Sequence, residues 1–369
     1  MPITPVAFLV ALAVQDPTPQ LPIEADFEQD GLQLDLDQVK SWNIDVHALL
    51  KTSYMVSPDK DVDGVSYDTA RAWINGTIAD WRFHFGMRAD VGRRLGSGLT
   101  PPDPSGDGLG FFGVPKRLGD ARANEVWVQT ELVEGLDWLD TLDLRVGRFK
   151  PPMMASSMFP ETGLLMYSRS FIGNDWDYYQ DGVMLRARTK RVRAWLSAQN
   201  GADRMDQDMG LTARGVVDLF GDGVNYNYEG AYRAEKKLAV SAGGAMHYDT
   251  STSDRSAQGV DVRMTGGELF GLGPFSLAAE YVDNGDGLGH LYSYGVMASF
   301  MLTDDIECAA SFEDFQDFDR VIGADLLRGS ISYYIAGHDV KLQLAYASAD
   351  SNAPLVDDET WVFGLNFGI

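Results

Sequence analysis

Apolar side chains alternate with polar, small or charged ones along most of the chain between residues 45 and 369. In residues 81–91, one face carries Trp, Phe, Met, Ala and Val, and the other carries Arg, His, Gly and Asp. Successive side chains of a strand point to opposite sides, so a period of two predicts β-strands with two different faces. Each run lasts for about ten positions, which is also the length of a strand that crosses a membrane.

The same division recurs down to the end of the chain, most clearly in residues 183–188, 192–199, 306–313 and 361–369. We count about 16 or 17 candidate strands. A single-chain bacterial barrel with both ends on one side needs an even number of strands. We therefore predict an all-β fold, a transmembrane antiparallel β-barrel of about 16 strands.

The connections are of two kinds. Tight turns are expected at residues 79–80, 189–190 and 337–338, and long acidic loops at 57–65, 95–120, 200–207, 249–256, 283–289 and 351–358. Short turns at one end and long loops at the other are typical of outer-membrane barrels. Aromatic residues recur near the expected strand ends, as they do at membrane interfaces: Trp42, Tyr54, Trp73, Trp81, Tyr248, Tyr281, Tyr346 and Trp361. A soluble β-sandwich would show the same alternation and stays an alternative.

Composition excludes several other classes of protein. The 369 residues contain 54 acidic and 30 basic side chains, a formal net charge of -24 that disfavours binding to nucleic acid. A single cysteine, Cys308, cannot form an intramolecular disulfide, and five scattered histidines do not suggest a zinc module. After the amino terminus no apolar run approaches the roughly 18 residues of a spanning helix.

The first 40 residues lack the alternating pattern of the rest of the chain. Residues 1–15 contain a short apolar core followed by a small-residue cleavage signal, which predicts a secretory signal peptide with a truncated front, because no Lys or Arg precedes the core. A disordered or mature tail is the alternative. Residues 16–40 form an acidic leader, and residues 41–369 the predicted barrel.

Charge is unevenly distributed along the chain. Residues 71–237 carry 22 basic and 22 acidic side chains, whereas residues 238–369 carry 5 and 20. The strand register predicts a basic wall on the polar face of neighbouring strands, formed by Arg145, Arg186, Arg188, Arg193, Arg214 and Arg233. It predicts a facing acidic wall of Asp261, Glu280, Glu307 and Glu313. Such walls would favour anions near the arginines, unless the charges simply pair locally along the barrel.

One region resembles a known family. Residues 144–152 read LRVGRFKPP, and Tyr167-Ser168-Arg169-Ser170 follows within an irregular stretch, residues 153–172. This resembles the phosphate-selective porin O and P family over roughly residues 45–235. The resemblance implies a homotrimeric diffusion channel with a loop folded inward at the waist, here carrying Met153, Phe159, Glu161, Tyr167 and Arg169. Because this loop holds few cations and the other loops are acidic, we expect at most a modest anion or phosphate preference.

Other motifs carry little weight. Asp59, Asp61 and Asp63 match the first half of a calcium loop, but Ala70 stands where that loop needs Glu, so a solvated hairpin with weak divalent binding is the better interpretation. No catalytic or nucleotide-binding motif is present, and we expect no cofactor and no enzyme activity.

The sequence thus predicts an outer-membrane porin embedded in the lipid bilayer that passes small hydrophilic solutes or inorganic anions. An alternative from another class is a structural or adhesive outer-membrane barrel with a plugged lumen, whose acidic loops bind divalent cations.

Overall fold

The computed structural model describes residues 42–57, 62–78, 81–89, 121–136, 138–200, 209–225, 227–234, 237–250, 256–267, 273–286, 289–317, 322–351 and 358–368. The predicted signal peptide, leader and much of the long loops lie outside the described residues. Sixteen strands follow one another: β1 (Trp42–Ser57), β2 (Val62–Ile78), β3 (Trp81–Ala89), β4 (Ala121–Leu136), β5 (Leu139–Phe149), β6 (Gln180–Arg188), β7 (Val192–Asn200), β8 (Met209–Phe220), β9 (Ala239–Asp249), β10 (Ser256–Gly266), β11 (Phe275–Asp286), β12 (Gly289–Met301), β13 (Ile306–Asp317), β14 (Ile322–Ala336), β15 (Val340–Ser351) and β16 (Asp358–Gly368).

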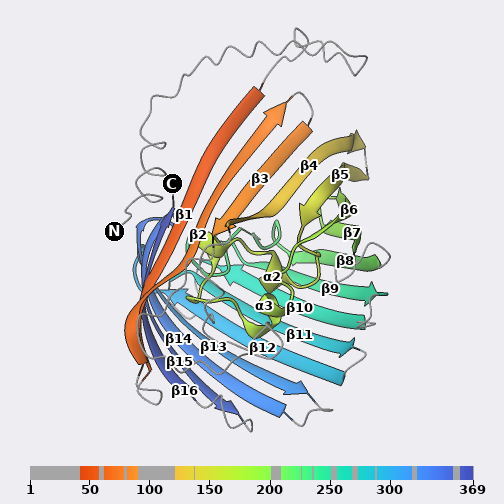
Figure 1. The fold of residues 1–369 in the computed structure, drawn as a ribbon. Coiled ribbons are helices and arrows are strands. Elements are labelled where there is room, and N and C mark those ends of the chain that lie inside the picture. Colours follow the sequence, from red (N-terminus) through yellow and green to blue (C-terminus); the bar gives the residue numbers. More distant parts are fainter. Residues whose placement is uncertain are drawn as a thin grey trace.

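The sheet is a closed antiparallel barrel (Figure 1). Each strand pairs with its neighbours in the sequence, and β1 closes the ring by pairing with β16 from Leu49↔Gly368 to Val56↔Trp361. Closure leaves no strand edge unpaired, which is the requirement for a sheet surrounded by lipid. The predicted strand number and class of fold are confirmed.

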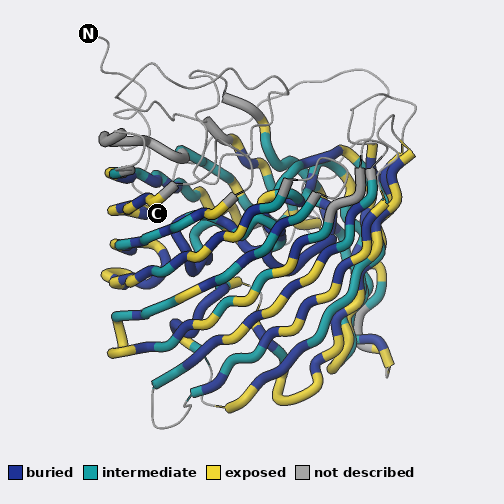
Figure 2. Tube along the Cα trace, turned by 90° about the horizontal axis from the view of Figure 1, so that it is seen from below, coloured by how far each residue is buried: buried dark blue, intermediate teal, exposed yellow. Residues whose placement is uncertain are grey.

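The two faces of each strand differ as the alternation predicts. In β16, Trp361, Phe363 and Leu365 are exposed on the outside, while Val362 and Asn366 are buried on the inside. Figure 2 shows the same alternation of exposed and buried positions along many strands. The apolar rows therefore form the outer surface, contrary to the arrangement that a soluble sandwich requires.

Several expectations about connections need correction. The turn at residues 189–191 between β6 and β7 is tight, as predicted, but residues 283–286 belong to β11 and residues 62–65 to β2. Trp73 does not join the outer aromatic residues, because it faces the interior and lines a cavity described below. No helix among the described residues is long and apolar enough to cross a membrane.

Two connections enter the barrel. The inner segment, residues 150–179 between β5 and β6, contains α2 (Ala155–Met158), a short 3-10 helix (Glu161–Gly163) and α3 (Phe171–Asp175), which begins where the Ser170 hydroxyl accepts a hydrogen bond from the Gly173 amide. Figure 1 shows α2 and α3 inside the ring of strands. The inner turn, residues 221–238 between β8 and β9, enters from the opposite end, the one that carries the tight turns.

If the exposed apolar face contacts lipid, a charge placed there destabilises the barrel. Leu196 on β7 is 55% exposed on the outside, and we expect Leu196→Arg to lower the free energy of unfolding from lipid vesicles by about 2–4 kcal/mol. Thr141→Arg, which adds the same charge on the cavity side of β5, is the matched control with a smaller effect. Equal losses in a urea titration would contradict the assignment of the two faces.

Candidate functional site: a cationic cavity beside the inner segment

Inward-facing basic and amide side chains hold the carbonyl groups of the inner segment. Lys341 Nζ on β15 donates to the Leu164 carbonyl oxygen at 2.6 Å, and Arg214 on β8 donates to the Met153 carbonyl oxygen at 2.9 Å. Further donors to carbonyls of this segment are Lys51, Arg328 and Gln343. A backbone carbonyl buried without a partner costs free energy, so these contacts are what permits irregular backbone inside the barrel.

Carboxylates of the predicted acidic wall hold the backbone amides. Glu280 accepts a hydrogen bond from the Ser156 amide at 2.9 Å, and Glu313 accepts one from the Phe171 amide and pairs with Arg328. Asp261 forms an ion pair with Arg214 at 2.6 Å. Glu307, also buried, holds the inner turn.

The acidic wall therefore needs correction. Its four carboxylates face inward, as the register predicts, but the two inner connections cover them, and none lines the open cavity. Arg214 of the basic wall is buried in the same way. The alternation reveals which way a side chain points, but not whether water or another segment fills the space in front of it.

The inner turn reaches the inner segment and binds it. The Glu229 amide donates to the Gly163 carbonyl oxygen, and Glu229 Oε2 accepts from the Leu165 amide, both at 2.9 Å. Arg233, predicted on a strand of the basic wall, lies instead in this turn with a φ of 58°. The Cζ atom of Arg233 lies 5.3 Å from the centroid of the Tyr232 ring. Arg233 is not among the residues that line the cavity.

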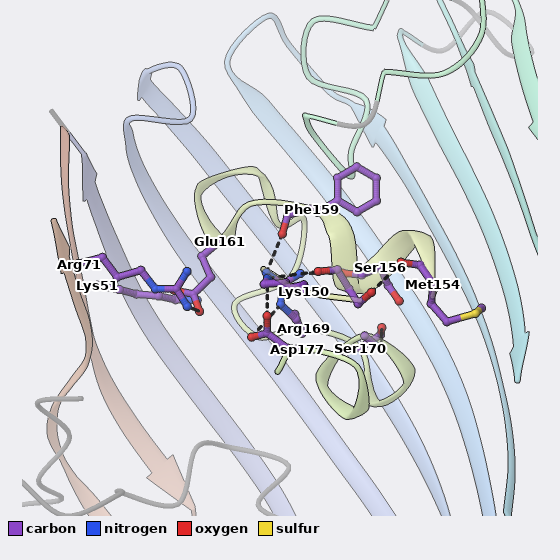
Figure 3. Close-up of polar contacts among 12 residues, drawn as sticks. Lys51, Arg71, Lys150, Met154, Ser156, Phe159, Glu161, Arg169, Ser170 and Asp177 are labelled. Atoms are coloured by element: carbon purple, nitrogen blue, oxygen red, sulfur yellow. Dashed lines mark hydrogen bonds and ion pairs between the residues drawn. The ribbon is translucent and has the colours of Figure 1, made fainter. Parts of the chain in front are cut away.

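Three of the five predicted constriction residues do not line the cavity but are buried within the barrel. Tyr167 lies against Gly364 of β16, where a Cβ atom would come within 2.2 Å of the ring, and Lys51 Nζ lies 4.1 Å from the ring centroid. Met153 is fully buried. Arg169 turns back onto its own segment and donates to the Ser156 and Phe159 carbonyl oxygens at 2.7 and 2.6 Å (Figure 3). Of the five predicted residues only Phe159 and Glu161 line the cavity.

The cavity has a volume of about 900 Å³ and lies between the inner segment and the wall formed by β2 to β7. Its lining includes seven Lys or Arg side chains and four Asp or Glu side chains. The basic ones are Arg71, Arg82, Arg145, Lys150, Arg186, Arg188 and Arg193, and the acidic ones are Glu125, Glu131, Asp143 and Glu161. The structure thus brings four of the six predicted basic-wall residues together around one space.

Some of these charges are paired. Arg71 NH2 on β2 lies 2.6 Å from Glu161 Oε1 of the inner segment, a contact that links barrel wall and inner segment (Figure 3). Arg193 pairs with Asp218 at 2.5 Å. For Arg193 and Arg214 the structure therefore shows the local pairing that was the alternative to a functional wall.

Other arginines of the lining form no direct ion pair. Arg145 NH2 and Arg186 NH1 both donate to Gln129 Oε1, at 2.9 and 3.0 Å, and this acceptor is neutral. In the described part of the chain neither Arg145 nor Arg186 forms an ion pair, and the same holds for Arg82 and Arg188. These four guanidinium groups give the cavity its positive character.

Lys150 and Asp177, near the two ends of the inner segment, form an ion pair (Figure 3). Burial, reinforced by Arg169, lowers the pKa of Lys150 to about 8 despite the neighbouring Asp177 carboxylate. Burial alone would raise the pKa of Asp177, but Arg169, Lys150 and Arg71 outweigh it and hold that pKa well below its usual range. Asp177 is therefore ionised at neutral pH, whereas Lys150 loses its proton only slightly above neutral pH.

Arg71, Arg82 and Lys150 line the cavity but were not among the predicted site residues, although the alternation in residues 81–91 already placed Arg82 on the polar face of its strand. Of the weak calcium candidate, Asp59 and Asp61 lie outside the described residues and Asp63 lies in β2. The described ranges hold no group of three or more His, Cys, Asp or Glu side chains arranged to bind a metal ion.

The role of Glu307 as an anchor can be tested. It accepts hydrogen bonds from the Ala231 amide and the Tyr334 hydroxyl, so Glu307→Gln should loosen the inner turn and lower the hydrogen-exchange protection of its amides by about ten- to a hundredfold. Asp304→Asn, an exposed change in the turn between β12 and β13, should leave that protection unchanged. Unchanged exchange in Glu307→Gln would contradict the anchoring role.

A scan against protein-family models finds no match, and a search of curated proteins finds no relative. The resemblance to the phosphate-selective porin O and P family is therefore not confirmed. Solved structures of outer-membrane proteins do share the fold. OprB of Pseudomonas putida at high pH superposes with a TM-score of 0.59 and 11% identity, over 90% of this chain and 95% of that one.

Two further structures show the same likeness. OmpT of Vibrio cholerae, an outer membrane protein described in a trimer form, has a TM-score of 0.56 at 11% identity, over 89% of this chain and all of that chain. An anion-selective porin from Comamonas acidovorans has a TM-score of 0.55 at 11% identity, also over 89% and 100%. The chain therefore has the 16-strand barrel fold of outer-membrane porins.

Proposed function

We propose that this protein is an outer-membrane porin, a passive diffusion channel for small hydrophilic solutes and ions with a modest preference for anions. The observation that carries the proposal is the cavity of about 900 Å³, lined by charged side chains inside a closed barrel whose outer surface is apolar. A polar lumen inside an apolar belt is the arrangement of a water-filled pore.

Selection by size would occur where the inner segment faces the β2 to β7 wall. Phe159, Pro160 and Glu161 stand on one side, and Arg82, Arg145 and Arg186 stand on the other. Selection by charge would come from the unpaired guanidinium groups, partly offset by Glu125, Glu131 and Asp143 in the same lining. This balance supports a modest anion preference and gives no separate support for phosphate.

The remaining assignments follow from this function. The lipid bilayer of a bacterial outer membrane would surround the apolar belt, and residues 1–15 would direct export. A homotrimer is supported by the trimer form described for OmpT of Vibrio cholerae. We include no enzyme activity, cofactor or nucleic acid in the proposal; weak divalent binding would be confined to acidic loops.

The plugged structural barrel remains the second candidate, because the two inner connections cover the inward faces of much of β8 to β16. Planar-bilayer recordings separate the two functions. Stepwise conductance from refolded protein supports the channel, and silence from well-folded protein supports the plug.

Removing an unpaired cavity charge should reduce anion preference. We expect chloride to be favoured over potassium by less than about tenfold in the native channel, as the reversal potential under a salt gradient reports. Arg186→Gln should move that potential toward the cation side because it removes a guanidinium from the lining. Arg191→Gln, in the exposed turn beside β6, removes the same charge outside the cavity and should have little effect. Equal shifts of the reversal potential in the two variants would show that the cavity is not the region that selects ions by charge.

Selectivity should also depend on pH through Lys150. With a pKa of about 8, this side chain is charged at pH 7 and neutral at pH 9, whereas Asp177 stays ionised at both. Raising the pH from 7 to 9 should therefore weaken anion preference. Lys150→Arg, which stays charged over this range, should remove the change, and a persistent pH effect in that variant would exclude Lys150 as its source.

A further inference from the structure

We propose that the cavity has a binding site for small organic anions with a flat aromatic ring, such as arylcarboxylates. The inference rests on the proposed channel function and names a solute class for it. The volume of about 900 Å³ falls within the range of small-molecule sites, roughly 300–1,000 Å³.

The barrel wall presents aromatic rings to the cavity. Trp73 on β2, Trp127 on β4 and Trp195 on β7 all point inward, are only half-buried, and line the cavity. An indole ring exposed to water inside a lumen offers a flat apolar surface on which another ring stacks. Two of the three rings already contact a neighbour: Trp73 stacks on His47, and Trp127 contacts both His84 and the Arg145 guanidinium. Trp195 has no ring contact among the described residues and therefore offers the open surface.

Guanidinium groups stand beside these rings. Arg145 Cζ lies 3.7 Å from the centroid of the Trp127 ring, and its donors reach the neutral Gln129 side chain. Arg186 is the cross-strand partner of Trp195, so both side chains project from the same place on the inner face. An unpaired guanidinium next to an indole matches a molecule with a carboxylate at one end of a ring.

The two kinds of group act on different parts of the solute. Two N–H groups of the Arg186 guanidinium can donate to the two oxygens of a carboxylate, whereas the Trp195 ring would stack on the aromatic ring of the solute. Acetate has the carboxylate but no aromatic ring, and inorganic phosphate also lacks the ring. The arrangement therefore favours an arylcarboxylate over both, and it predicts slow passage with transient occupancy rather than free diffusion of that solute.

Current blockade measures this directly. Benzoate added to a single channel conducting chloride should interrupt the current at a concentration about tenfold or more below that needed with acetate or inorganic phosphate. Trp195→Leu should raise the half-blocking concentration of benzoate by about three- to tenfold, with acetate unchanged. Trp361→Leu removes a tryptophan from the outer face of β16 and should leave both values as they are.

Equal half-blocking concentrations for benzoate and acetate would overturn the proposal, and so would equal behaviour of Trp195→Leu and Trp361→Leu. If Trp195→Leu does not insert, Trp195→Met replaces it, with the same expected loss. Silence of well-folded native protein would overturn the channel function instead. The site is then tested by calorimetric titration of the micelle-bound native protein, where equal binding of benzoate and acetate counts against it.

Discussion

Irregular backbone inside a barrel must find a hydrogen-bond partner for each of its buried amide and carbonyl groups, and this requirement shapes the interior. Much of the wall from β8 to β16 meets that demand: Lys341 and Arg214 serve carbonyls, and Glu280 and Glu313 serve amides. Polar side chains that bind the inner connections in this way are not free to contact solutes. Fewer side chains of β2 to β7 bind the inner segment, and the cavity lies beside these strands.

The same requirement explains why net charge describes the lumen poorly. The chain carries a net charge of -24, yet basic side chains outnumber acidic ones around the cavity. Carboxylates such as Asp261 and Glu307 are buried beneath the two inner connections, where they neutralise Arg214 or bind backbone amides. These carboxylates lie outside the cavity, so the field inside it depends mainly on the charged groups of its own lining, in which basic side chains outnumber acidic ones.

Alternation with period two was sufficient to predict the strands and the direction of most side chains, because both depend on local sequence. It gave 16 or 17 candidate strands, and the even number followed from the rule for single-chain barrels. The alternation could not distinguish Glu280, which meets the inner segment, from Arg186, which meets the cavity, since both occupy polar-face positions. Arg233 was misplaced because the sequence around it resembles an extended run, whereas the structure bends there at positive φ. Contacts such as Arg71–Glu161 join positions 90 residues apart and leave no local signal.

Tyr167 lies across the seam where the first and last strands meet. Lys51 on β1 binds its carbonyl group and covers its ring, and Gly364 on β16 leaves room for that ring. Gly364 and Lys51 thus form two sides of one binding place for Tyr167, which is complete only when β1 pairs with β16. Pairing of β1 with β16 and packing of the inner segment against this seam consequently stabilise one another.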